Sequence, residues 1–174
     1  LFGIVPYRRS FSRPAVAVSV FLVLVPSWLS LVYLQAAEPH GRALAMTVLV
    51  IVWAADVGAY FVGRSLGRRK LAPKVSPGKT WEGVTGGAVL AGLTAWGAAA
   101  LLDLPPAAFV ALGVVTALVS VVGDLTVSMF KRNVGLKDSG TLLPGHGGVM
   151  DRIDSLTAAV PVFAFGLKLA GYLV

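Results

Sequence analysis

The sequence predicts an all-α fold: a polytopic integral membrane helical bundle with about five transmembrane helices, forming a single domain over residues 1–174. Three observations lead to this prediction: 56% of the residues are hydrophobic, only 13% are charged, and the mean hydropathy is +0.81. Soluble chains carry roughly 25% charged residues, so this chain has too few polar side chains to coat a water-soluble monomer. The absence of cysteine excludes a disulfide scaffold and any cysteine nucleophile or metal ligand.

Five apolar stretches are long enough to cross a bilayer, which takes about 20 residues at about 1.5 Å per residue. We expect membrane-spanning helices at Ala15–Leu34, Ala43–Val62, Val84–Leu102, Ala107–Met129 and Leu156–Val174. Pro26 and Pro161 lie inside two of them and are tolerated because neighbouring helices satisfy the backbone. Since the chain begins at Leu1 rather than Met, we expect it to start partway into a longer chain.

The basic residues lie in alternate connections between these helices. Thirteen of the fifteen Lys and Arg residues fall in the segments 1–14, 63–83 and 130–155. Cytoplasmic loops carry an excess of Lys and Arg, so we expect these segments and the N-terminus inside, the C-terminus outside, and a multi-pass protein of the cell (inner) membrane. The net charge of +7 then reflects this bias and anionic lipid or phosphate partners, and no nucleic acid partner is expected.

Small residues recur every four positions in the third predicted helix, at Gly83, Gly87, Ala91 and Ala95. Such a stripe lets another helix approach closely. We favour packing within the chain over the alternative, a homodimer seam.

Two carboxylates lie near the cytoplasmic ends of predicted helices, Asp56 and Asp124. A carboxylate within a membrane costs roughly 2.5–3.5 kcal/mol on insertion scales, so it usually has a partner or a function. One helix face carries Asp124, Ser128, Lys131 and Arg132, at spacings of four, seven and eight residues. An internal Asp–Lys pair that neutralises itself is the alternative to a functional site.

The next connection adds further charged groups. Asp151 and Asp154 share one side of a helix if a helix starts there, although an Asp at that position is also a good helix cap. Asp138 and the basic residues Lys137 and Arg152 lie nearby. Carboxylates suit Mg²⁺ with its waters and phosphates, and cations with glycine amides suit phosphate, so the mixture favours a metal–nucleotide site over a proton relay. For His146, a phosphate hydrogen bond or a loop role is favoured over a general base.

The segment Gly78-Lys79-Thr80 imitates the end of a P-loop. Pro73 stands where that motif needs glycine, and we expect no preceding strand, so we reject a P-loop. Lys79 remains a candidate phosphate contact, and a solvated basic loop held to anionic headgroups is the alternative.

Several motifs together resemble the phosphatidate cytidylyltransferase (CDP-diacylglycerol synthase) family. The long motif comprises Ser128-Met129-Phe130-Lys131-Arg132, Lys137-Asp138, Leu143-Pro144-Gly145-His146-Gly147-Gly148 and Asp151-Arg152-Ile153-Asp154. Two further stretches resemble the same family: 56–64 and 76–83. The resemblance covers about residue 43 to the C-terminus and departs from the family in length, because members usually carry additional helices before this region.

The resemblance implies a reaction, CTP plus phosphatidic acid giving CDP-diacylglycerol plus pyrophosphate, with a divalent metal, usually Mg²⁺, whose number is left open. It implies that Asp124 and Asp151 are metal ligands. It also implies four catalytic residues: Asp124, Asp151, Lys131 and Asp154. Asp138 and Asp56 are weaker candidates for a direct or supporting role at the same site. The implied substrate-binding residues are Lys79, Ser128, Arg132, Lys137, His146, Gly147, Gly148 and Arg152. The implied partners are CTP, phosphatidic acid and the lipid bilayer, with a homodimer left open.

Two other functions remain as alternatives. The first is another enzyme, either a CTP-dependent polyprenol or phytol kinase or a cytidylyltransferase for a different lipid phosphate. The second is an ion-coupled transporter that uses Asp56 and Asp124. The sequence disfavours a transporter, because the polar groups gather at one interface and no pair of broken helices is evident.

Overall fold

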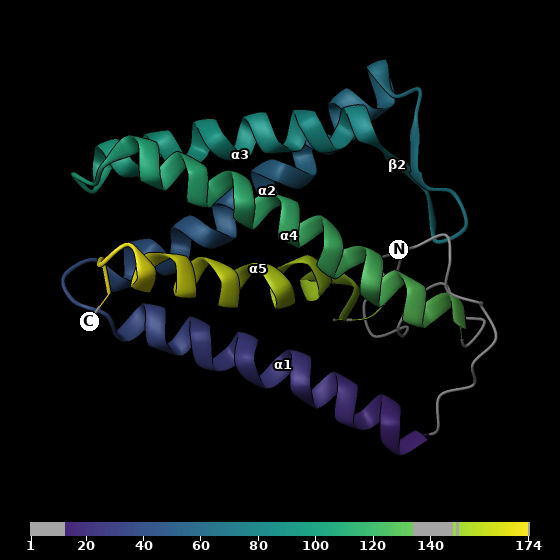
Figure 1. The fold of residues 1–174 in the computed structure, drawn as a ribbon, viewed down its shortest axis with the longest axis horizontal. Coiled ribbons are helices and arrows are strands. Elements are labelled where there is room, and N and C mark those ends of the chain that lie inside the picture. Colours follow the sequence, from purple (N-terminus) through teal and green to yellow (C-terminus); the bar gives the residue numbers. More distant parts are fainter. Residues whose placement is uncertain (1–12, 134–147, 149, 174) are drawn as a thin grey trace.

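In the part of the chain that the structure describes, five helices alternate in direction (Figure 1). The computed structural model describes residues 13–133, 148 and 150–173, except for the side chains of 13–17, 133 and 152. The helices are α1 (Arg13–Ala36), α2 (Gly41–Leu66), α3 (Trp81–Leu101), α4 (Pro106–Asn133) and α5 (Met150–Leu169). The predicted all-α bundle is confirmed, with one small addition described below.

Four of the helices are long and apolar enough to cross a membrane: α1 from Val18, α2, α3, and α4 to Arg132. The fifth helix, α5, is not among these four; it carries Asp151 in its first turn and Lys168 in its last turn. It also begins before the predicted Leu156 and ends at Leu169 rather than Val174. The apolar pattern therefore located every helix but missed the charged first turns of α5.

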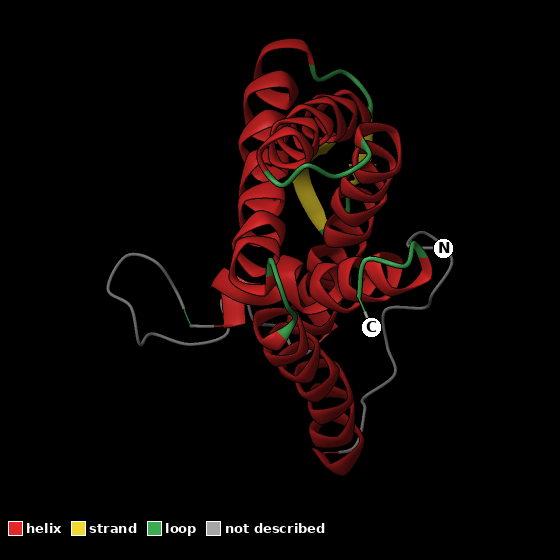
Figure 2. Cartoon of the chain, turned by 90° about the vertical axis from the view of Figure 1, so that its left-hand side faces the viewer, coloured by secondary structure: helices red, strands yellow, loops and turns green. Residues whose placement is uncertain are grey.

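The small two-stranded sheet was not predicted. Between α2 and α3, β1 (Lys70–Ala72) pairs antiparallel with β2 (Ser76–Thr80), with Lys70 opposite Thr80 and Ala72 opposite Ser76 (Figure 2). The expectation of no strand before Gly78 is wrong, since β1 precedes it. The rejection of a P-loop stands, because Gly78-Lys79-Thr80 lies inside β2 itself rather than in a loop after a strand.

The bundle has two chemically different ends. We call the end with β1–β2, the last turns of α4 and the start of α5 the hairpin end, and the end with the α1–α2 and α3–α4 connections the far end (Figure 1). Large side chains bury themselves toward the far end, where Phe109 of α4 and Phe163 of α5 meet edge-to-face at 5.9 Å between ring centroids. Leu34, Ile51 and Leu167 join the same core. The far end therefore holds most of the apolar core.

The stripe of small residues in α3 packs inside the chain. Gly83, Gly87, Ala91 and Ala95 are all buried. A Cβ added to Gly87 would lie 2.6 Å from the carbonyl oxygen of Ala55 in α2, closer than any side chain tolerates. The stripe thus brings α2 and α3 into backbone contact, and the interpretation as intramolecular packing is confirmed.

Candidate functional site: charged pairs at the hairpin end

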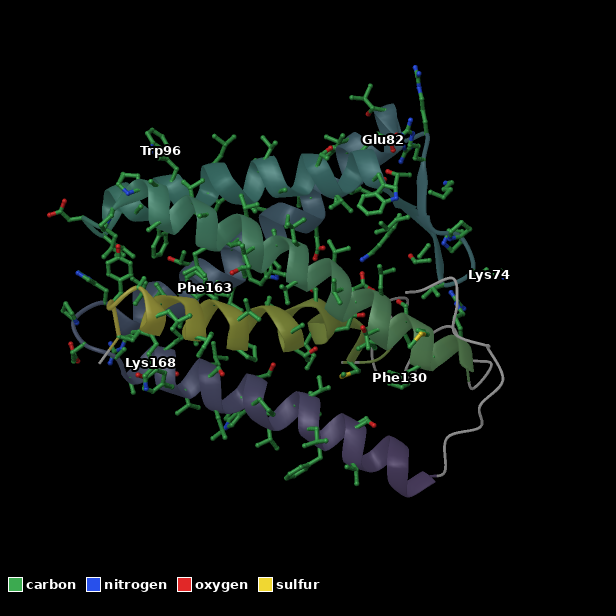
Figure 3. All side chains as sticks on the ribbon, in the orientation of Figure 1. Lys74, Glu82, Trp96, Phe130, Phe163 and Lys168 are labelled. Atoms are coloured by element: carbon green, nitrogen blue, oxygen red, sulfur yellow. The ribbon has the colours of Figure 1, made fainter. Side chains whose placement is uncertain are left out.

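Charged side chains from β2, α4 and α5 meet at the hairpin end. The C-terminal turns of α4 run beside the hairpin, and α5 begins next to them (Figure 3, in which Phe130 of α4 and Lys74 of the hairpin are labelled). Three ion pairs lie here, and each one joins two different elements. The tertiary fold, rather than any one helix, therefore assembles this cluster.

Asp124 forms the first pair. Its Oδ2 lies 2.5 Å from the Nζ of Lys79 on β2, and its Oδ1 accepts a hydrogen bond of 3.1 Å from the hydroxyl of Ser128 one turn later. About a quarter of each charged side chain remains exposed, 24% for Lys79 and 26% for Asp124. The pair is therefore within reach of a ligand from the hairpin end.

Lys131 forms the second pair, with two carboxylates of α5. Its Nζ lies 2.6 Å from Oδ1 of Asp151 and 3.9 Å from Oδ2 of Asp154. Because α5 begins at Met150, the two acidic residues share one helix side, as their spacing predicted. Asp151 also accepts a hydrogen bond of 2.9 Å from the amide of Gly148, so it both braces the start of α5 and holds Lys131.

Two further carboxylates belong to the same electrostatic cluster. Asp154 is almost fully buried and accepts a hydrogen bond of 2.8 Å from the Ser155 amide. Its carboxylate is repelled by the charge of Asp124 and attracted by the charges of Lys131 and Lys79. The carboxylate of Asp56 in α2 is attracted by the charge of Lys79 and repelled by the charge of Asp124. The cluster thus includes the Lys79–Asp124 pair, the Lys131–Asp151 pair and Asp56 of α2.

These contacts decide against the simplest alternative for the α4 stripe. An internal Asp124–Lys131 pair would neutralise both groups within one helix. Asp124 instead takes its lysine from β2, and Lys131 takes its carboxylates from α5. Asp124 and Lys131 therefore both pair across element boundaries.

Most predicted site residues that the structure describes converge here. Asp124, Asp151, Asp154, Lys131, Lys79 and Ser128 lie in the cluster, and the amide of Gly148 contacts it. Arg132 instead donates from Nε to the backbone oxygen of Val75 at 3.4 Å. Lys137, Asp138, His146, Gly147 and the side chain of Arg152 lie outside the described residues, so their roles stay predictions.

The chemistry of the donor set bears on the predicted magnesium. Among the residues that the structure describes, no group of three or more acidic or histidine side chains is placed to hold an ion. Mg²⁺, however, commonly binds through one or two carboxylates and takes its other ligands from waters and substrate phosphates. Carboxylates such as those of Asp124 and Asp151 have the chemistry of such partial ligands, and the described residues alone do not form a complete cage.

Sequence reasoning missed one residue of this region, Val75. It lies in a segment interpreted as a basic loop, yet it is buried in a small apolar cluster with Ala72 and Leu125. The signal that could have revealed it is the presence of Leu71, Ala72 and Val75 among so many cations, since a purely solvated loop needs no such residues.

Comparisons with known proteins agree with the motifs. The sequence model of the family described as "Cytidylyltransferase family" matches residues 4–170. A phosphatidate cytidylyltransferase of Pseudomonas aeruginosa is 55% identical over 160 residues, which covers 87% of this chain and 56% of the relative. A phosphatidate cytidylyltransferase of Haemophilus influenzae is 56% identical over 132 residues, covering 72% of this chain and 46% of the relative.

A more distant relative gives the same result. The phosphatidate cytidylyltransferase of Bacillus subtilis is 43% identical over 137 residues, or 76% of this chain and 50% of the relative. The chain thus spans about half the length of the curated relatives it matches. Since the family match extends over nearly all of the chain, the chain belongs to the cytidylyltransferase family.

Proposed function

We propose that this chain forms the catalytic region of an enzyme that transfers the cytidylyl group of CTP to phosphatidic acid, giving CDP-diacylglycerol and pyrophosphate. The supporting observation is that two ion pairs, Lys79–Asp124 and Lys131–Asp151, each join different elements at one end of the helical bundle. Family membership and the names of the relatives support the choice of reaction.

The reaction needs charge management more than covalent help from the protein. A phosphate oxygen of phosphatidic acid attacks the α-phosphorus of CTP, the bond from that phosphorus to the bridging oxygen breaks, and pyrophosphate leaves with the electron pair. The attacking oxygen is already ionised, so no strong general base is required. Positioning two anionic reactants and neutralising their charge are then the main tasks, as in phosphoryl transfer generally.

The ion pairs supply groups of both signs for these tasks. We expect Lys79 and Lys131 to exchange their carboxylate partners for phosphate oxygens when the nucleotide binds. Asp124 and Asp151, once released, would hold the magnesium ion, which when bound neutralises phosphate charge and orients the pyrophosphate leaving group. The exchange conserves the charge balance of a partly buried site, so neither sign is left uncompensated.

The remaining predicted residues complete this proposal. Ser128 would keep Asp124 oriented through its hydrogen bond, and Asp154 would support Lys131 from α5. Lys137, His146, Gly147 and Arg152 are proposed to contact the triphosphate or the lipid phosphate. The number of cations is left open in this proposal.

The position of the cluster suits one membrane-bound and one soluble substrate. We propose that the hairpin end faces the cytoplasm in the cell (inner) membrane, because Lys131, Arg132 and the six Lys and Arg residues of segment 63–83 lie at that end. The phosphate of phosphatidic acid lies in the headgroup plane of the bilayer, whereas CTP comes from the cytoplasm. The two substrates can then meet only at that plane.

A labelling experiment tests the reaction. The full-length protein is incubated with phosphatidic acid, Mg²⁺ and CTP carrying one label in cytidine and another in the γ-phosphate. Cytidine label in the lipid fraction and γ-label in pyrophosphate are expected. Lipid that carries only the γ-label would instead identify a kinase, and ion-dependent uptake without CTP turnover would identify a transporter.

A substitution tests the site. Asp151→Asn keeps an oxygen that can accept the Gly148 amide but loses the charge, so kcat should fall about 10²- to 10³-fold with little change in the melting temperature. Asp103→Asn is the matched control, because Asp103 is exposed at the far end with φ of 55°, a conformation that Asn tolerates. Near-normal turnover of Asp151→Asn with Mg²⁺ would remove Asp151 from the site.

A further inference from the structure

The tip of the β1–β2 hairpin is fastened to α4 by an apolar contact. Val75, which connects the strands, is 1% exposed and packs with Ala72 and with Leu125 of α4. Val121 and Met129, one turn before and one turn after Leu125, pack against the same cluster with Leu71. A loop held only by charge would expose Val75 to solvent, so this burial is a specific attachment.

The backbone of Val75 is held as well. Its amide donates to the carbonyl of Ala72 at 3.1 Å, which closes the turn of the hairpin. Its carbonyl accepts a hydrogen bond from Nε of Arg132, two turns after Leu125 on α4. Val75 is therefore gripped through its side chain and its main chain by the same helix.

The base of the hairpin is attached separately, to the start of α3. The Trp81 amide donates to the carbonyl of Arg69 at 2.9 Å, and the Arg69 amide donates to the carboxylate of Glu82 at 3.2 Å. Thr80, at the end of β2, caps α3 by accepting the Gly83 amide at 3.1 Å. Both ends of β2 are thus anchored, one to α3 and one to α4.

Lys79 lies on β2 between these two attachments, and its ammonium group reaches Asp124, the residue directly before Leu125. A lysine side chain has four rotatable carbon bonds and loses considerable rotamer freedom when it is held in one place. Fixing the backbone that carries it narrows the volume that its ammonium group can sample. The side chain of Val75 and the ammonium group of Lys79 therefore contact the same turn of α4, at Leu125 and Asp124.

We propose that Val75, with Arg132 bonded to its carbonyl, is a positioning residue that sets Lys79 over Asp124 and so prepares Lys79 to take a phosphate of the nucleotide. This inference rests on the proposed function for the role of Lys79. Val75, an uncharged residue outside the ion pairs, would then contribute to nucleotide binding. Arg132 would contribute indirectly, by holding the hairpin that carries Lys79.

The test compares Val75→Ala, Lys79→Ala and the double variant in the full-length protein, with initial rates measured against CTP and phosphatidic acid. Val75→Ala should raise KM for CTP about five- to tenfold and leave KM for phosphatidic acid unchanged. In the Lys79→Ala background the same substitution should add nothing, because it acts only through Lys79. Arg132→Ala should be non-additive with Lys79→Ala in the same way.

Two controls separate positioning from general stability. Val48→Ala removes the same two methyl groups from a fully buried site in the far-end core, so it should lower the melting temperature without changing KM for CTP. Val75→Ile keeps an apolar side chain in the cluster and should largely preserve KM for CTP. If Val75→Ala does not fold, Val75→Thr is tested in its place, because threonine has nearly the same side-chain volume as valine.

Each remaining outcome counts against one specific statement. Full additivity of Val75→Ala with Lys79→Ala, or an unchanged KM for CTP in folded Val75→Ala, would overturn the positioning role. A rise in KM for CTP with Val48→Ala equal to that with Val75→Ala would also overturn it. Normal CTP turnover in Lys79→Ala alone would instead refute the role of Lys79 in the proposed function.

Discussion

The two ends of the bundle are built by different interactions. At the far end, Phe109, Phe163 and Leu167 fill a continuous apolar core. At the hairpin end, the buried apolar cluster around Val75 is small, and cross-element ion pairs join β2, α4 and α5. Packed apolar contacts have one best arrangement, whereas ion pairs at a partly exposed site can exchange partners at little cost. The far end therefore carries most of the apolar packing, and the hairpin end carries the charged groups of the proposed site.

The largest effect on activity is expected from Lys131→Met. This change removes the cation that holds Asp151 and Asp154 but keeps a side chain of similar length. We expect kcat/KM to fall about 10²- to 10³-fold, because a group that neutralises phosphate charge in the transition state is lost. The measurement is incorporation of labelled cytidine into lipid.

Lys168→Met provides the matched control for that change. Lys168 lies in the last turn of α5 at the far end, with its ammonium group 6.0 Å from the ring centroid of Tyr33 (Figure 3). Its loss should leave cytidylyl transfer nearly unchanged. Equal losses of activity in both variants would erase the distinction between the two ends.

The next effect concerns stability and comes from Phe163→Ala. Phe163 is fully buried against Phe109, so truncation should lower the free energy of unfolding by about 3–5 kcal/mol, measured by thermal or denaturant unfolding in detergent. KM for CTP should not change in the folded fraction. Phe165→Ala, on the same helix at 63% exposure, should cost far less. A strong rise in KM for CTP with Phe163→Ala would show that the far end also shapes the site.

The smallest effect is expected from Thr116→Val. Within the described part of the chain, the Thr116 hydroxyl is the buried side-chain group that lacks a hydrogen-bond partner. Replacing it with an isosteric methyl should leave stability equal or raise it by about 1 kcal/mol. Thr47→Val, which removes a hydrogen bond of 2.8 Å to the Ala43 carbonyl, should not be stabilising. A clear loss of stability in Thr116→Val would indicate that the hydroxyl has a role in the core.

The helices could be predicted because hydropathy is a local property. A run of about 20 apolar residues must be helical in a bilayer to satisfy its own backbone, whatever surrounds it. The hairpin could not be predicted in this way, since Ser76-Pro77-Gly78-Lys79-Thr80 has little intrinsic preference for a strand. Its pairing with β1 is completed by the attachment of Val75 to α4.

The same division applies to the site. The family resemblance placed Asp124, Lys131, Asp151 and Asp154 in one functional group, and the structure pairs Lys131 with Asp151 and Asp154 and Asp124 with Lys79. The motif did not show which cation neutralises which carboxylate. Lys79 pairs with Asp124 only because the hairpin returns across α4, and Arg132 donates a hydrogen bond to the carbonyl of Val75.

The sequence alone determined a helical membrane bundle, the alternation of its helices and the set of charged residues at one end, since each follows from local composition and spacing. The tertiary structure decided the partners: α2 against α3 through small residues, the hairpin against α4, and Lys79 and Lys131 each with a carboxylate from another element. Partners are a matter of distance between segments far apart in the chain, and that distance depends on how all five helices pack at once.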